Sequence, residues 1–363
     1  MNPAAPAAPR NASLVLKIKV THLPIIMDRF NRETLKTKRG FNYTYYVSPT
    51  GESSKSTPAL FFIHGFPDSA HLWKDVVAHL AGIPNKIIIP DTLGYAGTDK
   101  PTDTAAYNHK GQADDLAEIL QAEQPQSSIV IGHDWGSAIA QRVYLHHPEL
   151  FSAVILLNVA YLPPADQPFD LNTVNDFTTK IFGYPQFAYW ELFSAEDGAE
   201  IIDGNLESMW EVLHGESGDW MKKMFCVKGG MKAYLKGDEH VPLKAYGKEP
   251  RWKDAFHKQF QRDGFDGPLR MYKAAVSNFH FESDKLIPKE RLVIKDPVLF
   301  IGCTGDFVCR HDMIEIPKKA GLLPDLEEQS IESGHWVPME KPDEVAKHIK
   351  NFVAKRFPVV SSL

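Results

Sequence analysis

Short apolar segments and amphipathic segments alternate over two parts of this chain, residues 42–157 and 297–357. Segments rich in β-branched and aromatic residues predict buried strands, and the alternating pattern of 42–47 predicts an antiparallel edge strand. Apolar residues at helical spacing predict helices between them. The strands are expected at 42–47, 59–63, 86–89, 129–131, 153–157, 297–301 and 326–331, and the helices at 70–80, 111–120, 137–145 and 344–357. This order predicts an α/β protein with a doubly wound, mostly parallel sheet.

The pattern changes between residues 162 and 285, which are aromatic-rich and helical in period. An insertion between two strands of an open α/β sheet predicts a cap over the carboxyl edge of that sheet, where ligands of such sheets bind. We therefore predict a core of residues 13–161 and 286–363, with a helical cap (lid) of residues 162–285. Residues 1–12 are rich in alanine and proline and predict a disordered tail.

The segment Gly132-His133-Asp134-Trp135-Gly136 joins the strand 129–131 to the helix 137–145. Glycines two positions before and after a central residue are typical of a strand–turn–helix that exposes a nucleophile. The central residue is Asp134, which is ionised at neutral pH and needs no base to attack. Attack on an acyl group would give a reactive anhydride, whereas attack on a saturated carbon gives an alkyl ester that water can cleave. The alternative is an aspartate that only caps the following helix.

Two further residues complete a catalytic triad with Asp134. Asp306 follows the strand 297–301, and His335 follows the strand 326–331. The nucleophile, the acid and the histidine come in the chain order that is typical of hydrolases with a strand–turn–helix nucleophile. Loops after parallel strands meet at one edge of the sheet, so the three residues can lie together. We predict that His335 activates water and that Asp306 orients the imidazole of His335. Alone, each could be an ordinary turn residue or a packed loop residue; their joint placement favours the triad.

The segment His64-Gly65-Phe66-Pro67 follows the strand 59–63. Its loop can aim the backbone N–H of Phe66 at the nucleophile, together with the N–H of Trp135. These two donors are the predicted oxyanion hole. The Phe66–Pro67 bond is a candidate cis peptide, and His64 itself is expected to be structural.

Four segments together resemble the soluble-type epoxide hydrolases of the α/β-hydrolase fold: His64-Gly65-Phe66-Pro67, Gly132-His133-Asp134-Trp135-Gly136, Gly305-Asp306-Phe307 and Ser333-Gly334-His335-Trp336. The resemblance covers about residues 40–357. It implies the α/β-hydrolase fold and the opening of an epoxide to a vicinal diol, with an ester on Asp134 that water activated by His335 hydrolyses. It also implies a role in detoxification, and no phosphatase domain of the kind that precedes this fold in some animal relatives.

The resemblance further implies two cap tyrosines that donate hydrogen bonds to the epoxide oxygen. The segment 264–272 resembles the family's segment that ends in one of them, Tyr272. For the other, Tyr184 is the first choice and Tyr189 the second, because the spacing of this segment departs from the family's by a residue. A phenol keeps its proton at neutral pH and can supply it to a forming alkoxide. The alternative for each tyrosine is core packing.

Two other functions stay open at this point. In a haloalkane dehalogenase the halide leaves as a stable anion, which needs N–H donors but no proton. Such enzymes commonly hold a polar residue where Phe66 stands, and fluoroacetate dehalogenases carry arginine where Trp135 stands, so both differences favour the epoxide hydrolase. A non-catalytic α/β-hydrolase that binds a small ligand is the second alternative. Turnover of styrene oxide, beside an assay for halide release, would separate all three.

The composition of the chain limits which partners it is expected to bind and in which cellular compartment it is expected to act. The 363 residues carry a net charge of -6 with both signs interspersed, which gives no basic face for nucleic acid. No apolar run approaches the ~20 residues of a membrane span, and no signal-peptide pattern begins the chain. The three cysteines, Cys226, Cys303 and Cys309, show no metal-binding spacing. We expect a cytoplasmic enzyme that acts on a small-molecule epoxide and water with no cofactor and no metal; Ser361-Ser362-Leu363 is only a weak peroxisomal signal.

Overall fold

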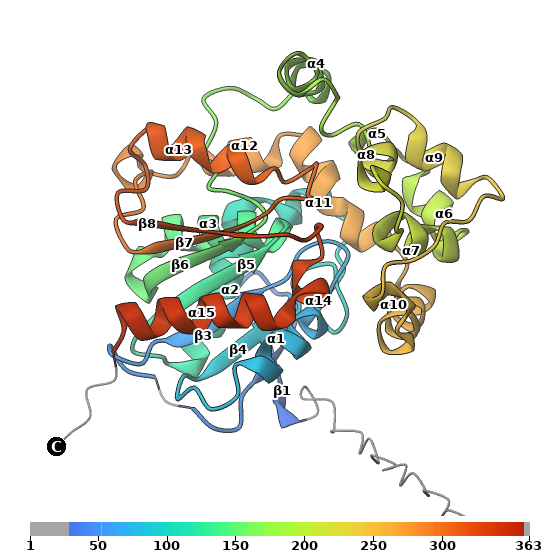
Figure 1. Cartoon of the computed structure of the whole chain (residues 1–363). Helices are drawn as coiled ribbons and strands as arrows, with labels where there is room; N and C mark the ends of the chain where they lie inside the picture. The colour runs from blue at the N-terminus through green and yellow to red at the C-terminus, as the bar shows by residue number, and fades with distance from the viewer. Residues whose placement is uncertain (1–28, 52, 359–363) are drawn as a thin grey trace, which may run out of the picture.

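A twisted, mostly parallel sheet lies at the centre of the molecule (Figure 1). The computed structural model describes residues 29–51 and 53–358, so the predicted tail 1–12 and the segment 361–363 lie outside the described residues. Within them the strand order is β1-β2-β4-β3-β5-β6-β7-β8, antiparallel between β1 and β2 and between β2 and β4, and otherwise parallel. The bounds are β1 Asn31–Lys36, β2 Asn42–Val47, β3 Ala59–Ile63, β4 Ile87–Pro90, β5 Ser128–His133, β6 Phe151–Leu157, β7 Val298–Cys303 and β8 Leu326–Ile331.

The predicted strands are confirmed in β2 to β8, with small shifts at their ends. The hydrophobic pattern did not predict β1, because all its side chains except that of Leu35 are polar and exposed. This strand exists because it pairs along its whole length with β2. As a result β2 lies between β1 and β4, so the prediction of β2 as an edge strand was wrong.

Helices cover both faces of the sheet because its strands are apolar on both sides. Leu60 and Phe62 of β3 pack in the same cluster as α1 (Lys74–His79) and α15 (Pro342–Arg356). The alternate residues Phe61 and Ile63 pack with α2 (His109–Glu123) and α3 (Trp135–His146) on the other face. These helices confirm the predicted ones, except that 70–80 begins with the 3₁₀ turn Ala70–Trp73 before α1. The core also contains α13 (Glu315–Lys319) and α14 (Val337–Glu340).

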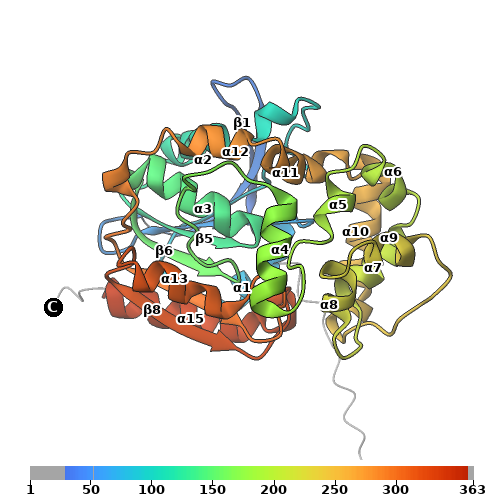
Figure 2. The same cartoon turned by 90° about the horizontal axis from the view of Figure 1, so that it is seen from above.

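The chain between β6 and β7 forms the helical insertion that the sequence predicts. Figures 1 and 2 show α4 above the sheet and α5 to α10 beside it. The bounds are α4 Leu171–Phe182, α5 Trp190–Phe193, α6 Gly198–Asp203, α7 Leu206–His214, α8 Trp220–Phe225, α9 Gly230–Leu235, α10 Pro250–Asp263, α11 Asp266–Val276 and α12 Phe279–Asp284. The division of the chain into a core and a cap at residues 161 and 286 stays a prediction.

Charged contacts hold this insertion to the core on more than one side. Asp284 of α12 accepts a hydrogen bond from Arg142 Nε of α3 (2.8 Å) and lies 3.0 Å from His109 Nδ1 of α2. Burial alone would raise the pKa of Asp284, but His109 and Arg142 lower it far below its usual range. On another side, Arg251 of α10 pairs with Asp75 of α1 at 2.7 Å. The insertion is therefore fixed across the sheet edge that it covers.

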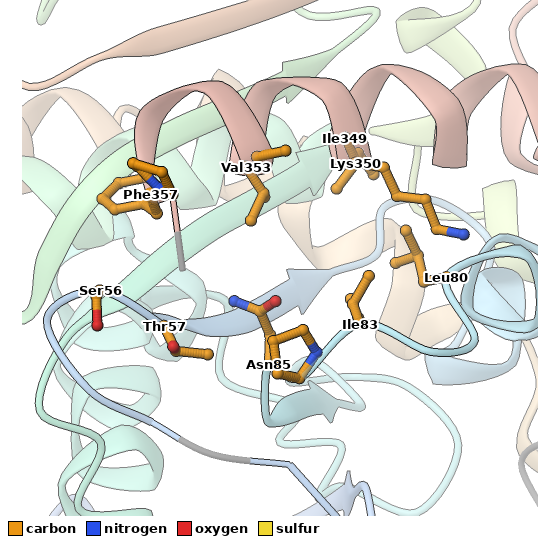
Figure 3. Close-up of a pocket in the computed structure, with 12 residues that line it drawn as sticks. Ser56, Thr57, Leu80, Ile83, Asn85, Ile349, Lys350, Val353 and Phe357 are labelled. Atoms are coloured by element: carbon orange, nitrogen blue, oxygen red, sulfur yellow. The ribbon is translucent and has the colours of Figure 1, made fainter. Parts of the chain in front are cut away.

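A hollow of about 340 Å³ lies beside α15, at the opposite edge of the sheet from the insertion. Figure 3 shows Ile349 and Val353 of α15 facing the loop that holds Ile83 and Asn85. Because Asn85 precedes β4, the hollow is at the amino edge of the parallel strands, away from the loops that carry the predicted triad.

None of the helices within 29–51 and 53–358 is long and apolar enough to cross a membrane.

Candidate active site

Asp134 occupies a tight turn between β5 and α3. Its φ of 55° and ψ of -129° are rare for a residue with a side chain and cost about 1–3 kcal/mol. A Cβ atom at Gly132 would collide with the backbone of Gly136, and one at Gly136 would collide with the carbonyl oxygen of Ile63. The two glycines therefore permit the turn that exposes Asp134. Its side chain makes no capping hydrogen bond to α3, which argues against the capping alternative.

Backbone donors hold the Asp134 carboxylate. The Phe66 N–H donates to Asp134 Oδ1 at 2.8 Å, and the Trp135 N–H donates to the same carboxylate. These are the two predicted oxyanion-hole donors. The Phe66–Pro67 bond is cis, as predicted. His64 accepts a backbone N–H from the loop after β4, and burial lowers its pKa to about 4, so its contacts are structural.

Asp306 and His335 lie with Asp134 at the carboxyl edge of the sheet. His335 Nδ1 donates to Asp306 Oδ2 at 2.6 Å, and His335 Nε2 lies 3.4 Å from Asp134 Oδ2. Asp306 is itself fixed, because Asn158 Nδ2 donates to Oδ2 and the Cys309 N–H donates to Oδ1, both at 2.8 Å. The structure thus brings the three predicted triad residues together, with the Nε2 atom of the histidine facing the nucleophile.

The charges of the triad stabilise one another. Burial alone would raise the pKa of Asp134, but the hydrogen bond and charge of His335 hold it below its usual range. The pKa of Asp306 is lowered in the same way, against its burial. For His335, burial alone would lower the pKa, but the carboxylates of Asp306 and Asp134 raise it well above its usual range. The two carboxylates therefore favour the protonated form of His335.

Three polar residues at this edge were not predicted from the sequence. Asn158 directly follows β6, has a φ of 63° and is fully buried, and a polar residue at the end of a buried strand is the signal that could have found it. His133 donates from Nε2 to the carbonyl oxygen of His335 at 2.8 Å. Burial, reinforced by the charge of Asp134, raises the pKa of Asp68 to about 7. The hydrogen bonds of Asn158 to Asp306 and of His133 to His335 hold the triad residues in place.

Tyr272 and Tyr189 approach the nucleophile from the insertion. Tyr272, in α11, is 2% exposed, and its ring centroid lies 5.2 Å from that of Phe66 and 5.4 Å from that of Trp135. Tyr189 directly precedes α5, with its ring centroid 5.9 Å from that of Tyr272. Burial raises the pKa of both phenols well above 10, and the charge of Asp134 raises it further. Both hydroxyl groups are therefore neutral donors.

Tyr184, the first choice from the sequence, is directed elsewhere. Its hydroxyl donates to the carbonyl oxygen of Phe307 at 3.0 Å and accepts from Arg310 Nη1 at 3.2 Å. Tyr184 directly follows Gly183, where α4 ends with a φ of 80° in a turn. A spacing argument does not fix directions in such a turn. The charge of Asp134 raises the pKa of Tyr189 and is not among the influences on the pKa of Tyr184, which favours the second choice, Tyr189.

The sheet order, the turn at Asp134 and the triad geometry agree with one fold family. A family model described as alpha/beta hydrolase fold matches residues 58–188. This chain has the α/β-hydrolase fold. The chain is similar to an epoxide hydrolase of Neurospora crassa, 24% identical over 326 residues that cover 85% of this chain and 92% of the relative. It is also similar to epoxide hydrolase A of Mycobacterium tuberculosis, 27% identical over 302 residues (82% and 90%).

Solved structures agree with this fold. The solved structure of an epoxide hydrolase from an endophytic Streptomyces matches this chain with a TM-score of 0.73 and 27% identity, over 90% of this chain and 96% of that one. The match spans the core and the helical insertion together, because it covers nearly the whole of both chains.

Proposed function

We propose that this α/β-hydrolase is an epoxide hydrolase, which opens an epoxide to a vicinal diol through an alkyl ester on Asp134. The observation that carries the proposal is the pair of buried phenols, Tyr189 and Tyr272, beside a carboxylate nucleophile. An epoxide opens to a strongly basic alkoxide that needs a proton donor, whereas a halide leaves as a stable anion. The phenols therefore favour an epoxide over a haloalkane as the substrate.

In the first step Asp134 Oδ2 attacks an epoxide carbon. Oδ1 is held by the Phe66 N–H, so Oδ2 is the oxygen that remains to attack. A reactive geometry puts the carbon ~3–3.5 Å from Oδ2 and the epoxide oxygen ~3 Å from each tyrosine hydroxyl. Tyr189 and Tyr272 then donate to the oxygen as its charge develops, in a site shielded from water.

In the second step water hydrolyses the ester. Alkylation removes the charge of Asp134, so His335 loses one of the two carboxylates that favour its protonated form. The Nε2 proton passes to the alkoxide through the tyrosine hydroxyls or water, which completes the alcohol. The neutral Nε2 atom is then a base for the water that attacks the ester carbonyl carbon, while Asp306 keeps the proton on Nδ1. The N–H groups of Phe66 and Trp135 stabilise the oxyanion that forms on Oδ1. Every group needed comes from this chain and water.

Styrene oxide tests the reaction directly. We expect the purified protein to convert it to phenylethanediol, and to release no halide from a chloroalkane under the same conditions. Product is measured by chromatography and chloride by an ion-selective electrode. Halide release without diol would support the dehalogenase alternative. Binding of styrene oxide with neither product would support the non-catalytic one.

Replacing the cap tyrosines tests the donors. Tyr189→Phe or Tyr272→Phe is expected to slow alkylation about 10- to 100-fold, because one donor survives. The double variant should lose at least about 1000-fold, since the alkoxide then forms without a donor. Single-turnover kinetics measure this step. Tyr184→Phe is the matched control and should change the rate less than about 3-fold, because its hydroxyl bonds the loop after β7. A larger effect at Tyr184 than at Tyr189 would contradict the assignment.

We also propose that the protein acts in the cytoplasm on small epoxides, in a detoxifying role. The proposal rests on the composition of the chain and on the resemblance to soluble-type enzymes, whose substrates are reactive electrophiles. Two measurements test this proposal. One is the distribution of the native protein between cell fractions, and the other is the survival of cells exposed to styrene oxide.

A further inference from the structure

Cys309 adds a thiol to the catalytic cluster that the proposed reaction does not use. One ligand atom from each of Asp134, Cys309 and His335 lies within 4.8 Å of the other two. The Cys309 thiol contacts the His335 side chain by a hydrogen bond, and the residue is only partly buried. These side chains come from the loops after β5, β7 and β8, so three unlike donor atoms meet at one point of the sheet edge.

Thiolate, imidazole and carboxylate are the three protein ligand types of zinc. With metal–ligand distances of about 2.0–2.3 Å, the ligand atoms of a tetrahedral site lie roughly 3.3–3.7 Å apart. The 3.4 Å between His335 Nε2 and Asp134 Oδ2 already meets this spacing. Asp306 accepts from Nδ1 of the same imidazole, which is the arrangement that orients a metal-binding histidine.

We propose that Asp134, Cys309 and His335 form a binding site for a thiophilic divalent cation such as Zn²⁺, which inhibits the enzyme reversibly. The cation would take Oδ2 of the nucleophile, Nε2 of the base and the thiolate of Cys309, and the Nε2 and thiol protons would pass to water, so that neither Asp134 nor His335 can react. Cys309 supplies the third and softest ligand, which favours zinc over magnesium or calcium. The cation is an inhibitor here and has no part in the reaction. The inhibition rests on the function proposed above, whereas the binding does not.

Cobalt tests the binding without any activity measurement. Co²⁺ replaces Zn²⁺ in such sites, and a thiolate ligand gives an intense charge-transfer absorption band. We expect this band in the wild-type protein and in Cys226→Ala, a control that removes a buried thiol outside the cluster. It should be lost in Cys309→Ala and in Cys309→Ser, with circular dichroism confirming the fold of each. A band that persists in both Cys309 variants, or its absence from the wild type, would overturn the proposal.

Inhibition by Zn²⁺ gives the second readout. Each variant is assayed with styrene oxide and compared with its own rate in the presence of a chelator. Loss of a single outer-shell partner costs about 10- to 100-fold in metal affinity, so loss of the ligand Cys309 should raise the inhibition constant at least about 100-fold. Cys226→Ala should match the wild type. Equal inhibition of the wild type and Cys309→Ala would refute the site, whereas a Cys309-dependent cobalt band without any epoxide turnover would refute only the proposed reaction.

Discussion

Asp134→Ala is expected to reduce diol formation from styrene oxide by at least about 10⁴-fold, because the variant has no group that can form the ester. The fold should survive, since the Asp134 side chain makes no capping hydrogen bond to α3 and the glycines that permit the turn remain. Circular dichroism and the melting temperature check this point. A substantial rate in a folded Asp134→Ala protein would be incompatible with the mechanism.

Labelled water locates the oxygen that the diol receives from Asp134. In H₂¹⁸O under single turnover, the wild-type protein should release diol without the label, because the new oxygen comes from the carboxylate. The label should enter Asp134 and appear in the diol only in later turnovers. Mass spectrometry of the product and of the peptide that contains Asp134 measures both. Labelled diol in the first turnover would mean direct attack by water, with no ester.

His335→Gln should separate the two halves of the reaction. Alkylation needs Asp134 and the tyrosines, whereas hydrolysis of the ester needs a base, so the adduct is expected to accumulate. Steady-state turnover should fall by at least about 10³-fold, the lower range for loss of a triad member. Intact-protein mass spectrometry should show the protein plus the mass of one substrate molecule.

A double variant is the control for this experiment. His335→Gln combined with Asp134→Ala should give no adduct, which ties the added mass to the nucleophile. If His335→Gln consumes epoxide without accumulating any adduct, His335 does not act as the base of the second step. The single and double variants share the same change at position 335, so a difference between them reports only on Asp134.

The sequence by itself predicted the parallel part of the sheet and the place of the triad. A run of apolar residues followed by glycines at a fixed spacing marks Asp134, because steric crowding allows that turn only without Cβ atoms at positions 132 and 136. Asp306 and His335 follow strands whose carboxyl ends lie at one edge, so their convergence follows from topology. Such features depend on local sterics and on the strand period, which the sequence carries.

The tertiary structure alone decided the features that depend on contacts between distant segments. β1 is polar and exists through its pairing with β2. The hydroxyl of Tyr184 contacts the distant loop after β7, and the meeting of Cys309 with Asp134 and His335 joins loops after three different strands. Local sequence carries no signal for these contacts, because the direction of a side chain in a loop is set by the surfaces that pack against it.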